Sequence, residues 1–124
     1  MVDPFLQTTA RDVFAAGDIA TYPYWVNGKM VRVEHYNVAM DQGSHAAFNM
    51  LGKMVPFGNV PFYWTRHYNK TVQVVGNGEY DDVYVQGDLA ANKFVAYYTK
   101  GNKIVQVAGQ QNSPAVLTFM EAFA

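Results

Sequence analysis

Small and apolar residues recur at three- and four-residue intervals between residues 37 and 51, which is the spacing of one helical face. These positions are Ala39, Gly43, Ala46, Ala47 and Met50. Asn37 is the predicted N-cap and Gly52 the predicted left-handed residue after the helix. Gly43 costs about 1 kcal/mol of helix propensity relative to alanine. The narrow stripe therefore predicts close packing against a neighbouring element.

Beyond Pro56 the pattern changes to β-branched and aromatic residues. Strands are predicted at 72–76, 83–86, 94–100 and 103–108, with a two-residue hairpin loop at Gly101 and Asn102. Residues 81 and 82 read as a turn, and a last helix runs from 114 to about 123 with Ser113 as N-cap. The predicted class is α+β, an antiparallel sheet with flanking helices, made of a linking part (1–55) and an α+β part (56–124).

The stretch 13–18, VFAAGD, ends a short apolar run in a glycine and a carboxylate. Gly17 lacks a Cβ, so a ligand can approach the backbone closely, and Asp18 offers acceptor oxygens to sugar-type hydroxyls. The pattern predicts a strand at 13–16 within a parallel sheet, whose neighbours need helical crossovers. Twelve residues precede Val13, too few to build that sheet. We therefore expect the chain to be the tail of a larger nucleotide- or flavin-binding protein.

Composition excludes several classes of function. The chain has no cysteine, which excludes disulfides, thiolate metal sites and a dithiol relay. Its three scattered histidines do not predict a metal site, and His45 and His67 are assigned structural roles. The net charge of −1 gives no footprint for nucleic acid. No apolar run approaches the roughly 20 residues of a membrane span, and there is no signal-peptide pattern.

Residues 34–37, EHYN, lie at the predicted helix start. A helix N-terminus presents unpaired N–H groups and a positive partial charge, so it attracts anions. A reduced flavin carries such negative charge around its pyrimidine ring. Two interpretations stay open: these N–H groups stabilise a flavin, or Glu34 satisfies the helix end while His35 lies on the surface.

The aromatic stretch 62–65, FYWT, is the second candidate. The Trp64 indole is large and needs few torsions fixed, so it can stack on a flat ring system. Packing in the core is the other interpretation of Trp64. Trp25 and its neighbouring tyrosines are assigned to packing or the surface.

The order of these motifs resembles the C-terminal part of the pyridine-nucleotide-dependent flavoprotein reductases. The matching motifs are VFAAGD at 13–18, VEHY at 33–36 leading into Ala39 and Gly43, and PFYWT at 61–65. They are similar to the apoptosis-inducing-factor family, especially its Rieske-containing factor-like members, and to the related ferredoxin reductases. The stretches DDVYVQGD at 81–88 and FVAYYTK at 94–100 resemble the factor-like branch in particular.

The resemblance implies a cofactor site. Asp18 would contact the FAD ribityl chain, with Gly17 beside it in the cofactor site. His35 and Tyr36 would give main-chain contacts to the flavin pyrimidine edge. Trp64 would lie beside the isoalloxazine and, with Glu34, border the nicotinamide site. Family members pass a hydride from NAD(P)H to FAD and then electrons to an acceptor. No catalytic residue is assigned to this chain, and by itself it is expected to hold no FAD and to be inactive.

The implied partners are the N-terminal FAD- and NAD-binding domains of the parent protein, an iron–sulfur electron acceptor and a second copy in a homodimer. The implied location is intracellular, with mitochondria as the family's setting. The glycine-rich Rossmann fingerprints, a Rieske segment and the long C-terminal insertion of apoptosis-inducing factor are all absent from the sequence. No His-Pro dipeptide occurs, which argues against the disulfide reductases. The alternative from another class is a non-enzymatic α+β interaction or dimerisation module.

Overall fold

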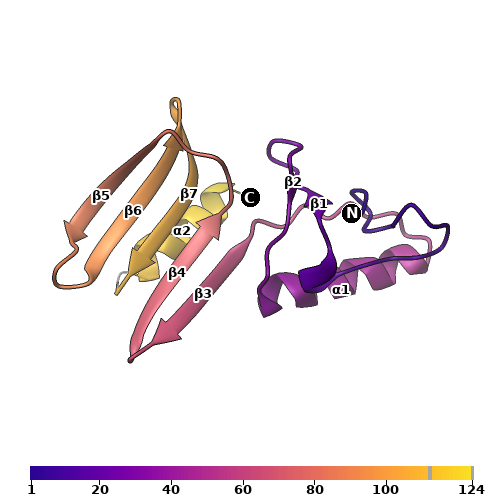
Figure 1. The fold of residues 1–124 in the computed structure, drawn as a ribbon, viewed down its shortest axis with the longest axis horizontal. Coiled ribbons are helices and arrows are strands. Elements are labelled where there is room, and N and C mark those ends of the chain that lie inside the picture. The colour runs from indigo at the N-terminus through magenta and orange to yellow at the C-terminus, as the bar shows by residue number, and fades with distance from the viewer. Residues whose placement is uncertain (112, 124) are drawn as a thin grey trace. The chain divides into compact units, whose positions relative to one another are not determined.

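The computed structural model describes residues 1–111 and 113–123. The chain forms two compact units, Met1–Asn59 and Val60–Ala124. The division falls a few residues after the predicted boundary at 55/56. The second unit holds an antiparallel sheet and a helix, and the first a longer helix with short extended segments (Figure 1). The predicted α+β class, with antiparallel strands and flanking helices, is confirmed.

The first unit contains η1 (Gly17–Ile19), β1 (Tyr22–Pro23), β2 (Met30–Val31) and α1 (Tyr36–Met50). β1 and β2 pair in antiparallel fashion, and Gly28 in the turn between them has φ 70°. Residues 22–31 therefore form a short hairpin. The core of the first unit contains the buried side chains of Val2, Leu6, Ala20, Tyr22, Tyr24, Val33, Val38, Ala46 and Phe57.

The buried face of α1 differs from the predicted stripe. Its buried residues are Val38, Gln42, Ala46 and Asn49, whereas Gly43, Ala47 and Met50 are exposed. The predicted face was wrong because two of the four inward positions carry polar side chains. A Cβ added at Gly43 would meet no atom within 4 Å among the described residues, so the close packing predicted there is not seen. The helix ends near Met50, and Gly52 follows with φ 77°, as predicted.

The segment 13–16 forms no regular strand. Its ladder contact is an isolated antiparallel bridge between Phe14 and Gln7, supported by the Thr8 N–H to Val13 O and Ala15 N–H to Leu6 O bonds of 2.8 and 3.0 Å. A strand needs continuous pairing of its backbone groups. Here the described neighbour is a looping segment with positive φ at Leu6, so the pairing is limited to these bonds.

The second unit is a five-stranded antiparallel sheet with one helix. The strands are β3 (Phe62–His67), β4 (Lys70–Gly76), β5 (Asp82–Asp88), β6 (Lys93–Lys100) and β7 (Lys103–Gln110). Their order across the sheet is β3-β4-β7-β6-β5. The four predicted strands correspond to β4 to β7, and the predicted loop at Gly101 and Asn102 joins β6 to β7. β3 is an additional edge strand that the strand prediction omitted.

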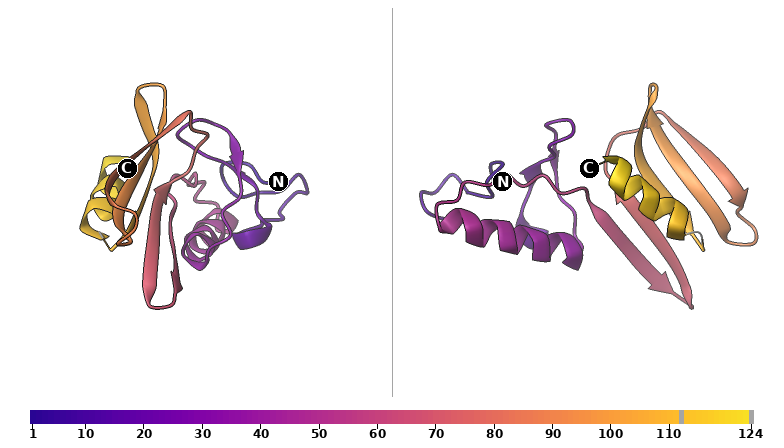
Figure 2. Two further views of the ribbon diagram at one scale, coloured as in Figure 1. Left: turned by 60° about the vertical axis from the view of Figure 1, so that its left-hand side comes forward. Right: turned by 180° about the vertical axis from the view of Figure 1, so that it is seen from behind.

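The helix α2 (Ser113–Phe123) lies on one face of this sheet (Figure 2). Val116 is fully buried with Val75, Val95 and Val107, which come from β4, β6 and β7. A Cβ added at Gly109 would lie 2.5 Å from Val116 Cγ2, so glycine is what lets the helix approach β7. The helix begins at residue 113 instead of 114, and the predicted capping by the Ser113 side chain lies outside the described residues.

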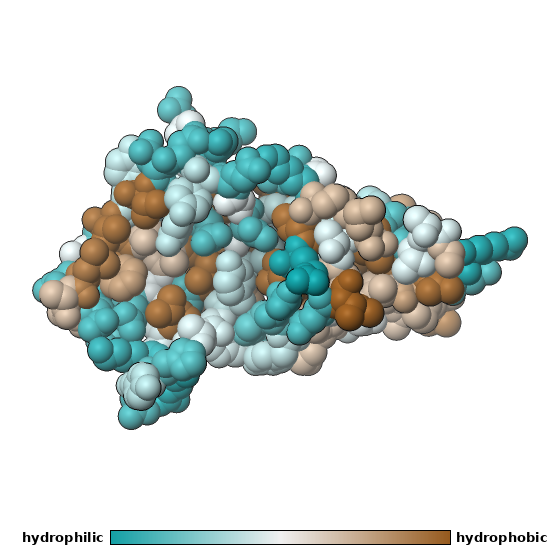
Figure 3. All heavy atoms as spheres, viewed as in Figure 1, coloured by the Kyte–Doolittle hydropathy of each residue, from teal (hydrophilic) through white to brown (hydrophobic). Residues whose placement is uncertain are grey.

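The opposite face of the sheet also carries apolar side chains. Alternation along the strands places Val85, Ala96 and Ala108 across from one another on this face. Figure 3 shows apolar side chains over β5 and β6 on the face away from α2. Val83 and Val85 are 42% and 46% exposed, so β5 adds little to the core.

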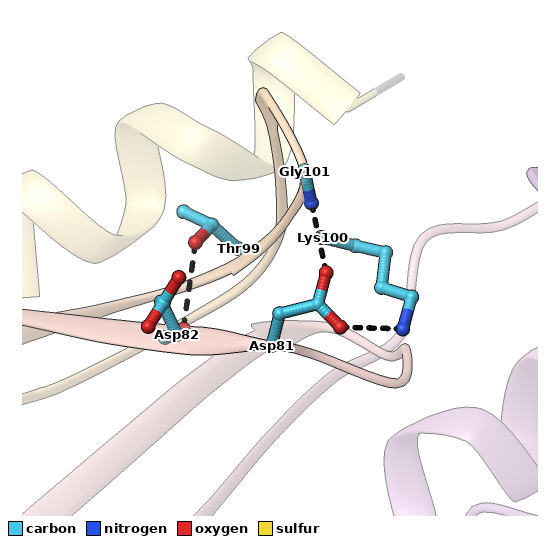
Figure 4. Close-up of polar contacts among 5 residues, drawn as sticks. All are labelled: Asp81, Asp82, Thr99, Lys100 and Gly101. Atoms are coloured by element: carbon cyan, nitrogen blue, oxygen red, sulfur yellow. Dashed lines mark hydrogen bonds and ion pairs between the residues drawn. The ribbon is translucent and has the colours of Figure 1, made fainter.

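Asp81 and Asp82, the residues of the predicted turn, lie at the start of β5, and the Asp81 side chain links this start to another segment of the chain (Figure 4). β5 begins at Asp82, while the Asp81 carboxylate accepts bonds from Lys100 Nζ at 2.6 Å and from the Gly101 N–H at 3.1 Å. These bonds lower the pKa of Asp81, the Lys100 bond first, and raise the pKa of Lys100. Asp81 thereby fixes the start of β5 to the tip of the β6–β7 hairpin.

Candidate cofactor-binding site

The Gly17–Asp18 turn begins η1 and is seated against α1. Gly17 is buried with φ 80°, a backbone conformation that favours glycine. A Cβ there would lie 3.3 Å from Ala39 Cβ. The Gly17 N–H donates to Gln42 Oε1 at 2.8 Å, and its carbonyl accepts from the Ala20 N–H at 2.8 Å. Asp18, between these fixed points, is exposed.

The start of α1 is capped by a histidine. His35 has extended backbone angles, φ −148° and ψ 139°, and its Nδ1 accepts from the Asn37 N–H at 3.2 Å. The prediction that Asn37 is the N-cap was therefore wrong by two positions. The imidazole also lies 4.9 Å from the Tyr36 ring, centroid to centroid. His35 therefore caps the helix start itself. It is not only a surface residue, and Glu34 is not the N-cap.

Glu34 precedes this cap and pairs with a cation. Arg32 Nη2 lies 2.6 Å from Glu34 Oε1, and both side chains are about half exposed, at 53% and 57%. Exposed pairs of this kind stabilise a fold by at most about 1 kcal/mol. The adjacent Val33 is buried, so the backbone here is anchored while the carboxylate stays accessible to solvent.

Five of the six predicted cofactor-contacting residues lie in the first unit. Gly17 and Asp18 belong to η1, and residues 34–36 lead into α1. Gly17 packs on Ala39, whose N–H donates to the His35 carbonyl at 3.0 Å. The structure therefore brings the Gly-Asp turn and the helix start together within one packed unit.

Trp64 belongs to the second unit and lies on β3. It pairs in register with Gln73, is half-buried, and contacts the Phe62 ring with centroids 5.5 Å apart. Phe62 packs against the core under α2. Trp64 is therefore part of the sheet's edge strand, not of a segment that precedes the sheet. Burial raises the pKa of the neighbouring Tyr63 phenol, and Tyr98 adds to the shift.

Other sequence candidates have structural positions. His45 Nδ1 lies 3.0 Å from the Asp41 carbonyl, and its ring contacts Phe57 at 5.2 Å. Trp25 is 47% exposed. In the described part of the chain, no three His, Cys, Asp or Glu side chains come together as a metal site, and no helix has the length and apolarity to cross a membrane.

Sequence reasoning missed two buried polar residues of α1, Gln42 and Asn49, which are 1% and 4% exposed. Together with Val38 and Ala46 they fall at 38, 42, 46 and 49, which is regular helical spacing. A search for apolar residues alone passes over such positions. That spacing was the available signal.

Comparisons with known proteins show which proteins the whole chain resembles. No protein-family model matches the chain. "Apoptosis-inducing factor 3" from Homo sapiens is 42% identical over 125 residues, which cover 99% of this chain and 21% of that protein. The 3-phenylpropionate/cinnamic acid dioxygenase ferredoxin–NAD(+) reductase component of Photorhabdus laumondii is 31% identical over 105 residues, or 85% of this chain and 27% of that protein.

Solved structures similar to this chain include ferredoxin reductases. The covalent putidaredoxin reductase–putidaredoxin complex matches with a TM-score of 0.88 and 25% identity, over 98% of this chain and 30% of the reductase chain. A ferredoxin reductase from Rhodopseudomonas palustris matches with a TM-score of 0.84 and 26% identity, over 94% and 29%. The chain is therefore a homologue of the C-terminal part of the ferredoxin reductases. The predicted similarity to the Rieske-containing, factor-like branch is confirmed by its apoptosis-inducing factor 3 relatives.

Proposed function

We propose that this chain is the C-terminal part of a flavoprotein that passes electrons from NAD(P)H through FAD to an acceptor. Residues 1–55 would complete the FAD-binding domain, and residues 56–124 would form the reductase C-terminal domain. The observation that carries the proposal is the buried Gly17 turn, which presents an exposed Asp18 beside the start of α1. The similarity to ferredoxin reductases supports the same function.

The residues at this turn fit an FAD ribityl chain. The Asp18 carboxylate is an acceptor for sugar-type hydroxyls, and it is exposed. Gly17 has no Cβ, and the left-handed backbone there would strain any other residue. The helix start adds a positive partial charge, and residues 35 and 36 supply main-chain atoms for the pyrimidine edge of the flavin.

The chemistry that bound FAD would supply is acceptance of a hydride from NAD(P)H and transfer of electrons to an acceptor. Trp64 would lie beside the isoalloxazine, and Glu34 would border the nicotinamide site with it. The Glu34 carboxylate pairs with Arg32, which helps to orient it. None of these side chains is assigned a covalent or proton-transfer role.

The partners follow from the same assignment. The chain spans less than a third of its relatives, and we propose that FAD- and NAD-binding domains of a parent protein supply the pyrophosphate sites. A matched solved structure is a reductase joined to putidaredoxin, which supports an iron–sulfur protein as the acceptor. A homodimer and a mitochondrial location are further parts of the proposal.

The test compares Asp18→Ala with Asp12→Ala in the full-length gene product. Asp12 is a matched control, because it is also an exposed carboxylate of the first unit, and its ion pair with Arg11 is exposed on both sides. A charge-assisted bond to a ribityl hydroxyl is worth about 1.5–3 kcal/mol. Asp18→Ala should therefore weaken FAD binding by at least tenfold, and Asp12→Ala should not. Equal FAD affinity in both variants would refute the Asp18 contact.

A further inference from the structure

Gln42 is a buried amide whose oxygen accepts a hydrogen bond while its nitrogen makes none among the described residues. Its side chain is 1% exposed in the middle of α1. Its Oε1 accepts from the Gly17 N–H, 25 residues away in sequence, at 2.8 Å. Its Nε2 is buried and has no hydrogen-bond partner in the described part of the chain.

Such a residue needs a reason to be inside. Burying an amide donor without a partner destabilises the folded state, and the neighbouring inward positions of α1 are the apolar Val38 and Ala46. An apolar side chain at 42 would avoid that cost. It would leave the Gly17 N–H, which has no backbone acceptor among the described residues, without a partner.

The hydrogen bond also fixes a geometry. The Gly17 N–H is held by Gln42 and the Gly17 carbonyl by the Ala20 N–H. The glycine itself lies against Ala39. The N–H side of Gly17 is thereby bound to α1, and its carbonyl side is held within the turn by Ala20. The helix therefore sets the direction of the exposed Asp18.

We propose that Gln42 is a positioning residue for Asp18. Through the Gly17 N–H it couples α1 to the turn and fixes the angle at which Asp18 meets the ribityl hydroxyls. This inference rests on the proposed function of Asp18. It assigns the positioning to Oε1, since Nε2 is the unused half of the amide.

The experiment uses three variants of the full-length protein. Gln42→Met keeps the length of the side chain and removes the acceptor, and Gln42→Glu keeps an acceptor oxygen. Ala46→Gly is the control, because it weakens the same helix face and leaves the Gly17 bond in place. Two quantities are measured: hydrogen exchange of the Gly17 amide in the cofactor-free protein, and FAD affinity.

Gln42→Met should speed Gly17 exchange and weaken FAD binding, each by about three- to tenfold beyond the effect of Ala46→Gly. Gln42→Glu should keep Gly17 exchange slow, and this result supports the proposal even if Gln42→Met does not fold. Unchanged exchange in Gln42→Met, or fast exchange in folded Gln42→Glu, would overturn it. So would fast exchange with unchanged FAD affinity.

Failure of the proposed function has a different signature. If Asp18→Ala leaves FAD affinity unchanged, the link from Gln42 to the cofactor falls with the role of Asp18. Gly17 exchange in the cofactor-free variants would still show whether Gln42 holds the turn.

Discussion

Asn49 and Val55 form a reciprocal pair at the end of α1. Asn49 Oδ1 accepts from the Val55 N–H at 2.6 Å, and Asn49 Nδ2 donates to the Val55 carbonyl at 2.9 Å. The same Nδ2 donates to the Phe5 carbonyl at 2.7 Å. One buried amide therefore ties three backbone segments of the first unit together.

Asn49→Ala should lower the free energy of unfolding by about 2–4 kcal/mol, because it removes three bonds and leaves backbone groups of Phe5 and Val55 without their partner. Urea unfolding measures the loss. Asn102→Ala is the control, since Asn102 lies in the exposed β6–β7 loop and should change stability by less than about 0.5 kcal/mol. Equal losses in the two variants would contradict the clamp.

The cap of α1 gives a second prediction. His35→Ala removes the acceptor of the Asn37 N–H and should cost about 1 kcal/mol, whereas His35→Asn supplies another capping oxygen and should cost less. The proposed flavin contact of residue 35 is made by the main chain, so FAD affinity should be nearly equal in these two variants. Thermal melts and flavin titrations check both parts. A large loss of FAD in His35→Asn would assign the contact to the imidazole instead.

Asn49 and His35 show what sequence patterns could and could not predict. Four strands, the hairpin at residue 101 and the end of α1 just before Gly52 were predictable, because β-branched runs and glycine turns are local signals. The cap at His35 was not, because histidine is outside the common N-cap residues. Gln42 and Asn49 were missed because a search for apolar residues passes over polar side chains, and because Gly17 and Phe5, which they also bind, are distant in sequence.

The missed strand β3 had a local signal. Residues 62–65 are aromatic and β-branched, as strands prefer, and Tyr68 and Asn69 both have positive φ. Together they make the two-residue turn between β3 and β4. The sequence contains Asn69 as a turn former, but the aromatic run also fits stacking on a flat ligand or packing in the core, and no strand was predicted there. Which residues contact FAD was predicted only through the family resemblance, and those contacts stay predictions.

The Asp81–Lys100 pair predicts a pH dependence. The folded pKa of Asp81 is lowered below its ordinary value of 3.8, so its contribution is present above that value and is lost as the pH falls through the folded pKa. The raised pKa of Lys100 makes its contribution complete below 10.5 and lost as the pH rises through the folded pKa. The difference in unfolding free energy between the wild-type protein and Asp81→Asn should therefore be constant near neutral pH. It should disappear in acid, as the pH falls through the folded pKa of Asp81.

Unfolding measured across this acid range checks the assignment. Lys103→Met is the matched control, because Lys103 is an exposed lysine of the same hairpin outside the Asp81 contacts. It should keep the acid dependence that Asp81→Asn loses. A difference between wild type and Asp81→Asn that persists below the folded pKa would rule out this pair as its source.

Substitutions of Trp64 distinguish a redox role of the indole from a role in packing alone. Trp64→Phe keeps an aromatic ring against Phe62 and should cost about 1 kcal/mol or less, while Trp64→Ala should cost about 1–2 kcal/mol, because the indole is only half-buried. In the full-length protein both variants should alter the flavin spectrum and the rate of hydride transfer, with the larger change in Trp64→Ala. A loss of about 3–5 kcal/mol in Trp64→Ala with normal kinetics would place the indole in the core.

The most direct test of the central claim is the visible absorption spectrum of the purified full-length gene product, recorded before and after anaerobic addition of NADH or NADPH. We expect one FAD per polypeptide and bleaching of the flavin band by one of the two nucleotides, while the isolated 124-residue chain stays colourless. A full-length product without flavin, or a flavin that neither nucleotide reduces, would contradict the account. The first of these results would favour the non-enzymatic interaction module instead.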